Sequence, residues 1–335
     1  MKFSEIGEFG FIDRINVQMI SRPEGVVQGI GDDAAVFEPR SGWLMILTTD
    51  MLVEGVHFIR DAMTPHQLGR KCLAVNLSDV AAMGAEPLDA YISVAIPSGA
   101  DVEYMEALYG GMRAMAQAHR VNLLGGDTTR SPGPLVVNVA LTGTLPKDEL
   151  ILRSGAKPGD AIYVTSWLGD AAGGLDLLRN HRIWEADGSA VLLKAQLEPR
   201  PHLGEGRFLA NNHFATAMID LSDGVASDLR HICQRSGVGA VIHETRLPIS
   251  ETLRAYARTF DLDPLKLALS IGEDYGLLLT VPETRASELE ARFQERFGRE
   301  ISRIGETAGE PGMILLAEDG ARRFLEPKGW DAFRS

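Results

Sequence analysis

Apolar runs alternate with amphipathic segments along the whole chain. Runs such as WLMIL (43–47) and VNLL (121–124) are typical of buried strands. The pattern predicts strands over 33–37, 43–49, 88–96, 121–125, 134–145, 161–165, 215–220, 239–243, 275–281 and 301–305. It predicts helices over 4–19, 65–83, 101–119, 169–180, 201–211, 222–236, 250–259 and 283–297. A polar stretch at 146–160 separates two halves, so we expect domains at 1–150 and 151–335.

The predicted helix 65–83 carries a carboxylate on its apolar face. Thr64 can cap this helix, and Pro65 suits its first turn. At about 100° per residue, one face collects Leu68, Cys72, Val75, Asp79 and Met83. An unpaired carboxylate there is costly, so we expect Asp79 to meet a cation or strong hydrogen-bond donors. The alternative is a helix rolled so that Asp79 reaches the rim of the core.

Six acidic boxes punctuate the chain, and most of them close an apolar segment. They are GIGDDAA (29–35), TTDMLVEGVHF (48–58), VNLSDVAAMGA (75–85), LLGGDTTR (123–130), IDLSDG (219–224) and SIGEDY (270–275). Hard oxygen ligands of this kind suit Mg²⁺ together with substrate phosphates. The expected ligands are Asp33, Asp50, Asp79, Asp127 and Asp220, to which Thr48 and Thr49 can add oxygens. Any one of these aspartates could instead be a turn residue or a helix cap, as Asp32 could be.

Other nucleotide-binding patterns do not fit the first box. Gly29, Gly31 and Ala34 imitate a dinucleotide fingerprint, but Asp32 and Asp33 place negative charge where a pyrophosphate would lie. A helix should also follow this box, whereas Pro39 and Gly42 indicate a strand and a turn, and no P-loop sequence is present. Arg153 could clamp a phosphate, although an exposed arginine in a linker is usually only solvated.

Composition restricts the partners. The 335 residues are 45% hydrophobic and 24% charged, with a formal net charge of −13. This charge argues against nonspecific binding to nucleic acid or to an anionic membrane, and divalent cations would reconcile it with a phosphate ligand. Two cysteines outside any CxxC pattern, and no signal peptide or apolar span of membrane length, lead us to expect a cytoplasmic protein.

Taken in order, the boxes resemble those of the thiamine-monophosphate kinases, which are grouped with aminoimidazole-ribonucleotide synthetase and selenophosphate synthetase. The similar segments also include LRSGAKPGDAIYVT, LGDAAGGL, IDLSDGVASDL, LSIGEDYGLLLTVP and PKGWDAF. The resemblance implies an α+β, two-domain fold like that of the synthetase. In this fold an N-terminal mixed sheet forms a β-barrel with a second subunit, and a C-terminal α/β domain follows.

The resemblance also implies a reaction and its residues. ATP would phosphorylate thiamine monophosphate to thiamine diphosphate, the last step of thiamine diphosphate biosynthesis, with several Mg²⁺ ions and no covalent intermediate. Mg²⁺ would be held by Asp33, Thr48, Thr49, Asp50, Asp79, Asp127, Asp220 and Asp223. ATP would be bound by Gly126, Asp127, Arg153, Ser222 and Tyr109, and thiamine monophosphate by His57, Glu273 and Trp330. Of these residues, Asp50, Asp127 and Arg153 are expected to be catalytic.

Two departures from the family pattern stand out. Trp330 replaces a tyrosine found in many members, and its ring offers a better π-face to a cationic thiazolium. The family's Pro-x-Pro-Arg sequence is Pro199-Arg200-Pro201-His202 here, and the sequence assigns no role to Arg200 or His202. Two alternatives stay open, a related ATP-dependent synthetase with another acceptor and a non-catalytic nucleotide- or Mg²⁺-binding module.

Overall fold

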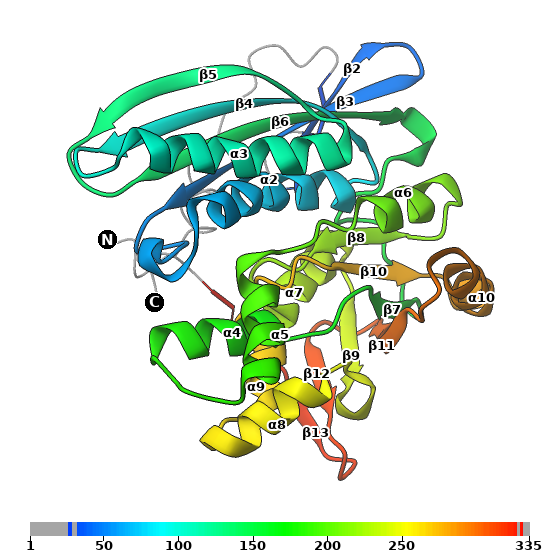
Figure 1. The fold of residues 1–335 in the computed structure, drawn as a ribbon. Helices are drawn as coiled ribbons and strands as arrows, with labels where there is room; N and C mark the ends of the chain where they lie inside the picture. Colours follow the sequence, from blue (N-terminus) through cyan, green and yellow to red (C-terminus); the bar gives the residue numbers. More distant parts are fainter. Residues whose placement is uncertain (1–25, 29–31, 327–328, 331–335) are drawn as a thin grey trace, which may run out of the picture.

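The first half of the chain folds into a six-stranded sheet (Figure 1). The computed structural model describes residues 26–28, 32–326 and 329–330, so the helix predicted over 4–19 lies outside the described residues. The strands run in the order β1-β2-β3-β6-β4-β5, and only β4 and β5 pair in parallel. Their bounds are β1 Val26–Gln28, β2 Ala35–Arg40, β3 Trp43–Val53, β4 Glu86–Pro97, β5 Asn122–Ser131 and β6 Val136–Pro146.

Two helices, α2 (Pro65–Ala82) and α3 (Val102–His119), cover one face of this sheet (Figure 1). Thr64 and Gln67 form a reciprocal capping box at the start of α2, which confirms the predicted cap. The two helices approach closely at two glycines. A Cβ atom on Gly69 would lie 1.9 Å from the Leu108 carbonyl oxygen, and one on Gly111 would lie 1.9 Å from the His66 carbonyl oxygen. Larger residues at either position would push the helices apart.

The second half forms a seven-stranded sheet in the order β13-β12-β9-β11-β7-β10-β8, in which only β9 and β12 pair in parallel. Its strands are β7 Ala161–Val164, β8 Ala217–Asp220, β9 Gly239–His243, β10 Leu277–Val281, β11 Ser302–Ala308, β12 Met313–Leu316 and β13 Arg322–Phe324. Its helices are α4 Asp170–Arg179, α5 Ala186–Leu197, α6 Leu203–Asn211, α7 Val225–Ser236, α8 Glu251–Phe260, α9 Pro264–Ser270 and α10 Ala286–Phe297. Short 3₁₀ turns lie at Arg60–Ala62, Lys147–Glu149, Glu244–Arg246 and Glu283–Arg285. The predicted α+β class is confirmed.

Helix α2 is the element that joins the two halves. One side of it packs on β3, β4 and β6, and the other side packs on α5, α6 and β8. A single hydrophobic core therefore runs from the first sheet through α2 to Tyr163, Phe214 and Phe293 of the second half. A helix covered on both sides is apolar around most of its circumference, which explains its weak amphipathicity. Polar groups on α2 consequently lie at the boundary between the halves.

The structure differs from the sequence prediction in specific elements. β3 and β5 continue through Asp50 and Asp127, so these two aspartates lie inside strands and do not close them. Helix α5 escaped prediction because Asp187-Gly188-Ser189 is typical of a turn, although it lies in the first turn of the helix. Helix α9 and strands β1, β12 and β13 were also missed; none exceeds seven residues, and a short segment carries a weaker periodic signal.

Candidate active site

Three carboxylates from distant parts of the chain converge between the two sheets. Asp33 precedes β2, Asp79 lies in the last turn of α2, and Asp220 ends β8. One oxygen from each of them lies within 4.8 Å of the others. This carboxylate cluster unites ligands that the sequence predicted separately, and the oxygen donors are those that Mg²⁺ prefers.

The carboxylate cluster is electrostatically strained without a cation. Burial raises the pKa of Asp220 to about 8, with Asp33 adding to the effect, although Ser78 Oγ donates a 2.7 Å hydrogen bond to Asp220. Burial also raises the pKa of Asp79 well above its ordinary value, and the carboxylates of Asp50, Asp220 and Asp33 raise it further. Both shifts indicate that the surrounding protein compensates the ionised forms only in part, and a bound cation would complete this compensation.

Strand β3 lines the carboxylate cluster on one side. Thr48 Oγ1 donates a short hydrogen bond to Asp79, and the Asp50 carboxylate lies close enough to raise the pKa of both Asp79 and Asp220. The Asp50 backbone N–H donates to Asn76 Oδ1 of α2 at 3.1 Å, which fixes the strand against the helix. Thr49 is exposed, and its hydroxyl donates to Asn138 Oδ1 at 3.2 Å, so its side chain turns away from the carboxylate cluster.

Arg153 brings a cation to the carboxylate cluster. Its Nε and Nη2 donate to Asp33 Oδ2 and Oδ1 at 2.9 and 2.8 Å, a bidentate pair. Burial lowers the pKa of Arg153, but the Asp33 carboxylate outweighs it and leaves the pKa above its ordinary value. The Arg153 backbone N–H also donates to Asp32, whose pKa burial raises to about 7. The predicted phosphate clamp is therefore a buried partner of the carboxylates.

The segment after β8 connects the carboxylate cluster to a second group of residues. The Ser222 carbonyl accepts from the Glu273 backbone N–H at 2.9 Å, and the Asp223 carbonyl accepts from the Trp330 backbone N–H at 3.2 Å. Burial raises the pKa of Asp228 well above its ordinary value, with Asp223 adding to the effect. Its carboxylate accepts from Gly224 N–H at 3.1 Å. Only three positions thus separate Asp220 of the cluster from Asp223, whose backbone holds Trp330.

His57 and Trp330 form the aromatic part of this second group. Their ring centroids lie 5.3 Å apart, with the planes tilted by 58°. The Val53 backbone N–H donates to His57 Nδ1 at 3.0 Å, so the neutral ring carries its proton on Nε2. Burial lowers the pKa of His57, with Glu273 opposing and Lys71 reinforcing this shift. The imidazole is therefore neutral at pH 7 and can donate from Nε2.

Glu273 completes the group. Its carboxylate forms a 2.9 Å ion pair with the buried Lys71 of α2 and accepts from Gln196 Nε2 of α5. The structure therefore brings His57, Glu273 and Trp330 together, and we call these three residues the His57 group. The sequence analysis missed Lys71, Gln196, Ser78 and Asn76.

Three other predicted residues lie apart from the carboxylate cluster. Asp127 is exposed on β5, which β6 and β4 separate from β3 by three strand spacings, or roughly 14 Å. A Cβ atom on Gly126 would lie 1.7 Å from the Ile92 carbonyl oxygen, so packing against β4 alone requires glycine here. Tyr109 lies half-buried on α3, against the core. No contact between Tyr109 and the cluster is present in the described part of the chain.

Arg200 and His202 belong to a separate network around the buried Glu205, in which His202 is buried and Arg200 is exposed. Arg200 and Arg299 both pair with Glu205, at 3.0 and 2.7 Å, and His202 Nδ1 lies 2.9 Å from Thr165 Oγ1. Burial lowers the pKa of His202 to about 4, so its ring is neutral. These contacts fasten α6 to β7 and indicate a packing role.

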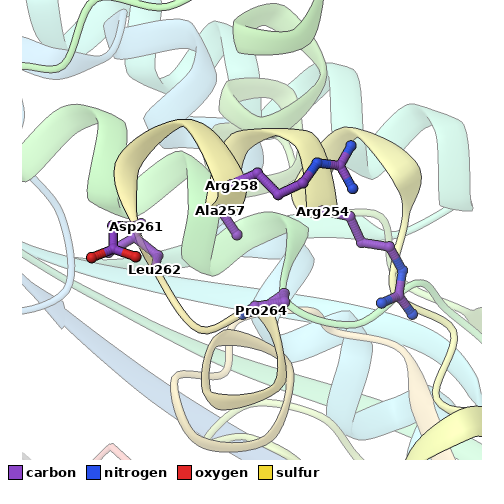
Figure 2. A pocket seen from close by; sticks show the side chains of 6 residues that line it. All are labelled: Arg254, Ala257, Arg258, Asp261, Leu262 and Pro264. Carbon is purple, nitrogen blue, oxygen red and sulfur yellow. The ribbon is translucent and has the colours of Figure 1, made fainter.

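A surface hollow of about 390 Å³ lies away from these groups. Figure 2 shows its six lining residues, on α8, in the turn that follows it and at the start of α9, with Arg254 and Arg258 projecting from α8. None of the carboxylates of the cluster lines it. No helix in the described ranges has the length and apolarity needed to cross a membrane.

Comparison with known proteins agrees with this geometry. The family model for the N-terminal domain of AIR synthase related proteins matches residues 31–145, and the model for the C-terminal domain matches residues 157–317. Thiamine-monophosphate kinase of Salmonella typhimurium is 38% identical over 98% of each chain, and that of Aquifex aeolicus is 34% identical over 99% of this chain and 100% of the relative.

Solved structures show the same likeness. The structure described as AaThiL complexed with AMPPCP and TMP superposes with a TM-score of 0.85 at 33% identity and covers 99% of this chain and 98% of that one. Thiamine-monophosphate kinase of Stenotrophomonas maltophilia K279a has a TM-score of 0.76 at 36% identity and covers 94% of this chain and 98% of that one. The chain therefore belongs to the AIR synthase related family and, within it, to the thiamine-monophosphate kinases.

Proposed function

We propose that this protein transfers the γ-phosphoryl group of ATP to thiamine monophosphate, giving thiamine diphosphate and ADP in the last step of thiamine diphosphate biosynthesis. The observation that carries the proposal is the segment 220–223. It places Asp220, a buried carboxylate of the cluster, two positions from the backbone that holds Glu273 and three positions from the backbone that holds Trp330. Thiamine monophosphate carries a phosphate and a cationic heterocycle. A cation held by the carboxylate cluster suits the phosphate, and the π-face and carboxylate of the His57 group suit the heterocycle. A relative solved with AMPPCP and TMP supports the same pairing of ligands.

The donor atoms fit magnesium. Asp33, Asp79 and Asp220 offer hard oxygens within 4.8 Å of one another, and the raised pKa values of Asp79 and Asp220 support a cation at this site. We propose that Asp50, Thr48, Thr49, Asp127 and Asp223 contribute further oxygens to one or more ions. When bound, Mg²⁺ would neutralise phosphate charge and align the two reactants.

We propose that Arg153 contacts the ATP phosphates, with Ser222 beside it and with Gly126, Asp127 and Tyr109 placed around the nucleotide. The two bonds to Asp33 use Nε and one Nη2 proton, so Arg153 keeps three of its five N–H donors for an anion. Asp127 lies outside the carboxylate cluster, so we assign it to a part of the nucleotide at a distance from Asp220. Asp50, Asp127 and Arg153 are the proposed catalytic residues.

The chemistry requires no general base. The second pKa of a phosphate monoester is about 6, so the acceptor phosphate is largely dianionic at neutral pH and is itself the nucleophile. The barrier is the approach of two anions, which positioning and charge neutralisation lower. We propose direct in-line transfer, in which the new P–O bond forms as the bond to ADP breaks. An acid-stable phosphoenzyme on the reaction path contradicts this step.

We propose that residues 1–150 bind ATP and Mg²⁺ and also pair two subunits, while residues 151–335 form the second domain of a cytoplasmic homodimer. The face of the first sheet opposite α2 and α3 supports pairing. Leu47, Met51 and Tyr91 are exposed there, with 39%, 56% and 44% of their surface accessible. Apolar side chains gathered on one sheet face favour burial against a second sheet.

The test is the production of thiamine diphosphate. Purified protein is incubated with ATP, Mg²⁺ and thiamine monophosphate, and the product is oxidised to its fluorescent thiochrome and quantified, with EDTA and free thiamine as controls. We expect Mg²⁺-dependent product from the monophosphate and none from free thiamine. A folded protein that binds ATP but forms no product contradicts the proposal, and it favours either a related synthetase with another acceptor or a non-catalytic nucleotide-binding module.

A further inference from the structure

The buried ammonium group of Lys71 lies beside Glu273 of the His57 group. Only 2% of the Lys71 side chain is accessible. Its Nζ is charge-paired with Glu273 Oε1 at 2.9 Å and donates to the backbone carbonyl oxygen of Gln196 at 3.1 Å. Lysine is almost never fully buried unless it is paired, and a buried pair is weak evidence for stability. The cost of burying Lys71 therefore calls for a role that a hydrophobic residue could not fill.

The second oxygen of Glu273 is held by another helix. Gln196 is 4% accessible, and its Nε2 donates a short hydrogen bond to Glu273 Oε2. The Gln196 side-chain oxygen is buried and accepts no hydrogen bond from a described residue. Helices α2 and α5 thus each hold one oxygen of the Glu273 carboxylate. Beside this carboxylate, the Gln196 side-chain oxygen receives no hydrogen bond from a described residue.

The backbone of Glu273 is fixed as well. Its φ is +62° and that of Tyr275 is +47°, conformations that cost a non-glycine residue free energy unless the surroundings impose them. The Glu273 N–H donates to the Ser222 carbonyl at 2.9 Å, and the Asp274 carboxylate accepts from Gly169 N–H at 3.0 Å. The Glu273 carboxylate is therefore oriented from both ends, which is the preorganisation expected of a group that reads a ligand.

We propose that Lys71 and Gln196 are positioning residues that orient Glu273 to accept hydrogen bonds from the amino group on the pyrimidine ring of the acceptor. This inference rests on the proposed function and deepens it. One oxygen of Glu273 is ion-paired with Lys71 and the other accepts a hydrogen bond from Gln196, so the carboxylate keeps lone pairs for a ligand, and the Gln196 side-chain oxygen adds a further acceptor. Because Lys71 compensates the charge of Glu273, this carboxylate is a better partner for a neutral amine than for a metal ion. In the carboxylate cluster Arg153 pairs with Asp33, whereas the hydrogen bonds that described side chains donate to Asp79 and Asp220 come from the hydroxyls of Thr48 and Ser78.

The test compares two substrates on four variants. Lys71→Met and Gln196→Met remove one donor each at similar volume, while Lys194→Met and Gln117→Met make the same changes at exposed positions. The substrates are thiamine monophosphate and its 4′-oxo analogue, which replaces the amino group with a carbonyl. The assays measure kcat, KM for each substrate and KM for ATP, and titration calorimetry with a non-hydrolysable ATP analogue measures acceptor binding.

We expect the wild type to prefer the amino substrate strongly in kcat/KM, because a site built for an N–H donor rejects an analogue without it. In Gln196→Met and Lys71→Met, KM for thiamine monophosphate should rise about tenfold or more while KM for ATP changes less than about threefold. The preference over the oxo analogue should shrink in parallel, and the two control variants should match the wild type. A folded Gln196→Met protein that keeps both the wild-type KM and the wild-type preference overturns the inference, even if Lys71→Met fails to fold.

The same measurements separate this inference from the proposed function. If the wild type phosphorylates both substrates equally well, it has the proposed function but does not recognise the amino group. This result overturns the inference and leaves the proposed function intact. A wild type that forms no product refutes the proposed function. In that case, calorimetry in which wild type and Gln196→Met bind thiamine monophosphate equally overturns the inference too.

Discussion

Removal of divalent cations should make the protein less stable as the pH rises through the neutral range. The reason is the burial of Asp220, whose pKa rises from 3.8 to about 8 on folding. An acid with a higher pKa in the folded state binds more protons there than in the unfolded chain. Its contribution to the free energy of unfolding is therefore fully present below the unfolded pKa and is lost as pH rises through the folded pKa.

The magnitude follows from the two pKa values. Each tenfold difference in acid constant is worth about 1.4 kcal/mol, so ionising Asp220 in the folded, metal-free protein costs roughly 6 kcal/mol in all. Between about pH 6.5 and about pH 8, the share lost is about 1.5 kcal/mol. Burial also raises the pKa of Asp79, so its contribution has the same sign.

Buried neutral histidines make stability depend on pH in the opposite direction, and this determines the pH range in which the aspartates can be tested. Burial lowers the pKa of His202 to about 4 and that of His231 to about 3, so unfolding takes up protons below the ordinary histidine pKa of 6.5. Stability therefore rises with pH up to that value, where the histidine contribution levels off. Above about pH 6.5 the aspartates dominate.

Urea unfolding at about pH 6.5 and about pH 8, in EDTA and then in Mg²⁺, measures the effect. Mg²⁺ should stabilise the wild type more at the higher pH, because it binds the ionised folded state and not the unfolded chain. Asp220→Asn is the matched control, since it should flatten the decline in EDTA and lose most of the stabilisation by Mg²⁺. A metal-free wild type whose stability is constant or increases between these pH values refutes the reasoning.

Three further predictions follow from single residues. Asp50→Ala and Asp127→Ala should each abolish thiamine diphosphate formation while circular dichroism stays native, and near-normal rates in both mean that the cation sites are elsewhere. Gly126→Ala should lower the melting temperature, because its Cβ atom would lie 1.7 Å from the Ile92 carbonyl oxygen, and an unchanged melting curve contradicts this. Burial raises the pKa of the Cys72 thiol to about 12, so a thiol reagent should label it only after unfolding, and rapid labelling of the native protein at that position opposes the assignment.

The sequence predicted the carboxylate cluster because each member lies in a segment with a strong pattern. Asp79 interrupts an apolar helix face, and the structure places it beside Asp33 and Asp220 with Thr48 as a donor. Asp127 had no comparable constraint. Its segment was predicted as a strand that ends before it, but the strand continues along the sheet edge to Ser131, and the side chain is exposed.

The polar positions of helix α2 also indicate contacts near Glu273, although the sequence analysis did not predict these contacts. Gln67, Lys71 and Ser78 fall within about 40° of one another on the α2 helix at about 100° per residue. In the structure all three side chains contact the second half of the chain, at Glu198, Glu273 and Asp220 respectively. The polar stripe of an amphipathic helix usually faces solvent. On a helix that is apolar elsewhere around its circumference, a polar stripe indicates a second packing partner. The identity of that partner could not be predicted, because it depends on how two distant sheets meet.

Arg153 shows how an acidic protein with a net charge of −13 can accept two anionic substrates. In this structure its guanidinium neutralises Asp33, so the same carboxylate has two possible counterions, Arg153 and a metal ion. A cation bound by Asp33, Asp79 and Asp220 would weaken the ion pair between Asp33 and the guanidinium and would leave more of the Arg153 donors for a phosphate. Cation and nucleotide binding would then be coupled through one carboxylate, and such coupling is reciprocal. Arg153→Lys keeps the charge but loses the bidentate geometry, so Mg²⁺ should increase ATP affinity less in this variant than in the wild type when both are measured by calorimetry. An equal increase in both proteins means that the Arg153–Asp33 pair does not transmit the coupling.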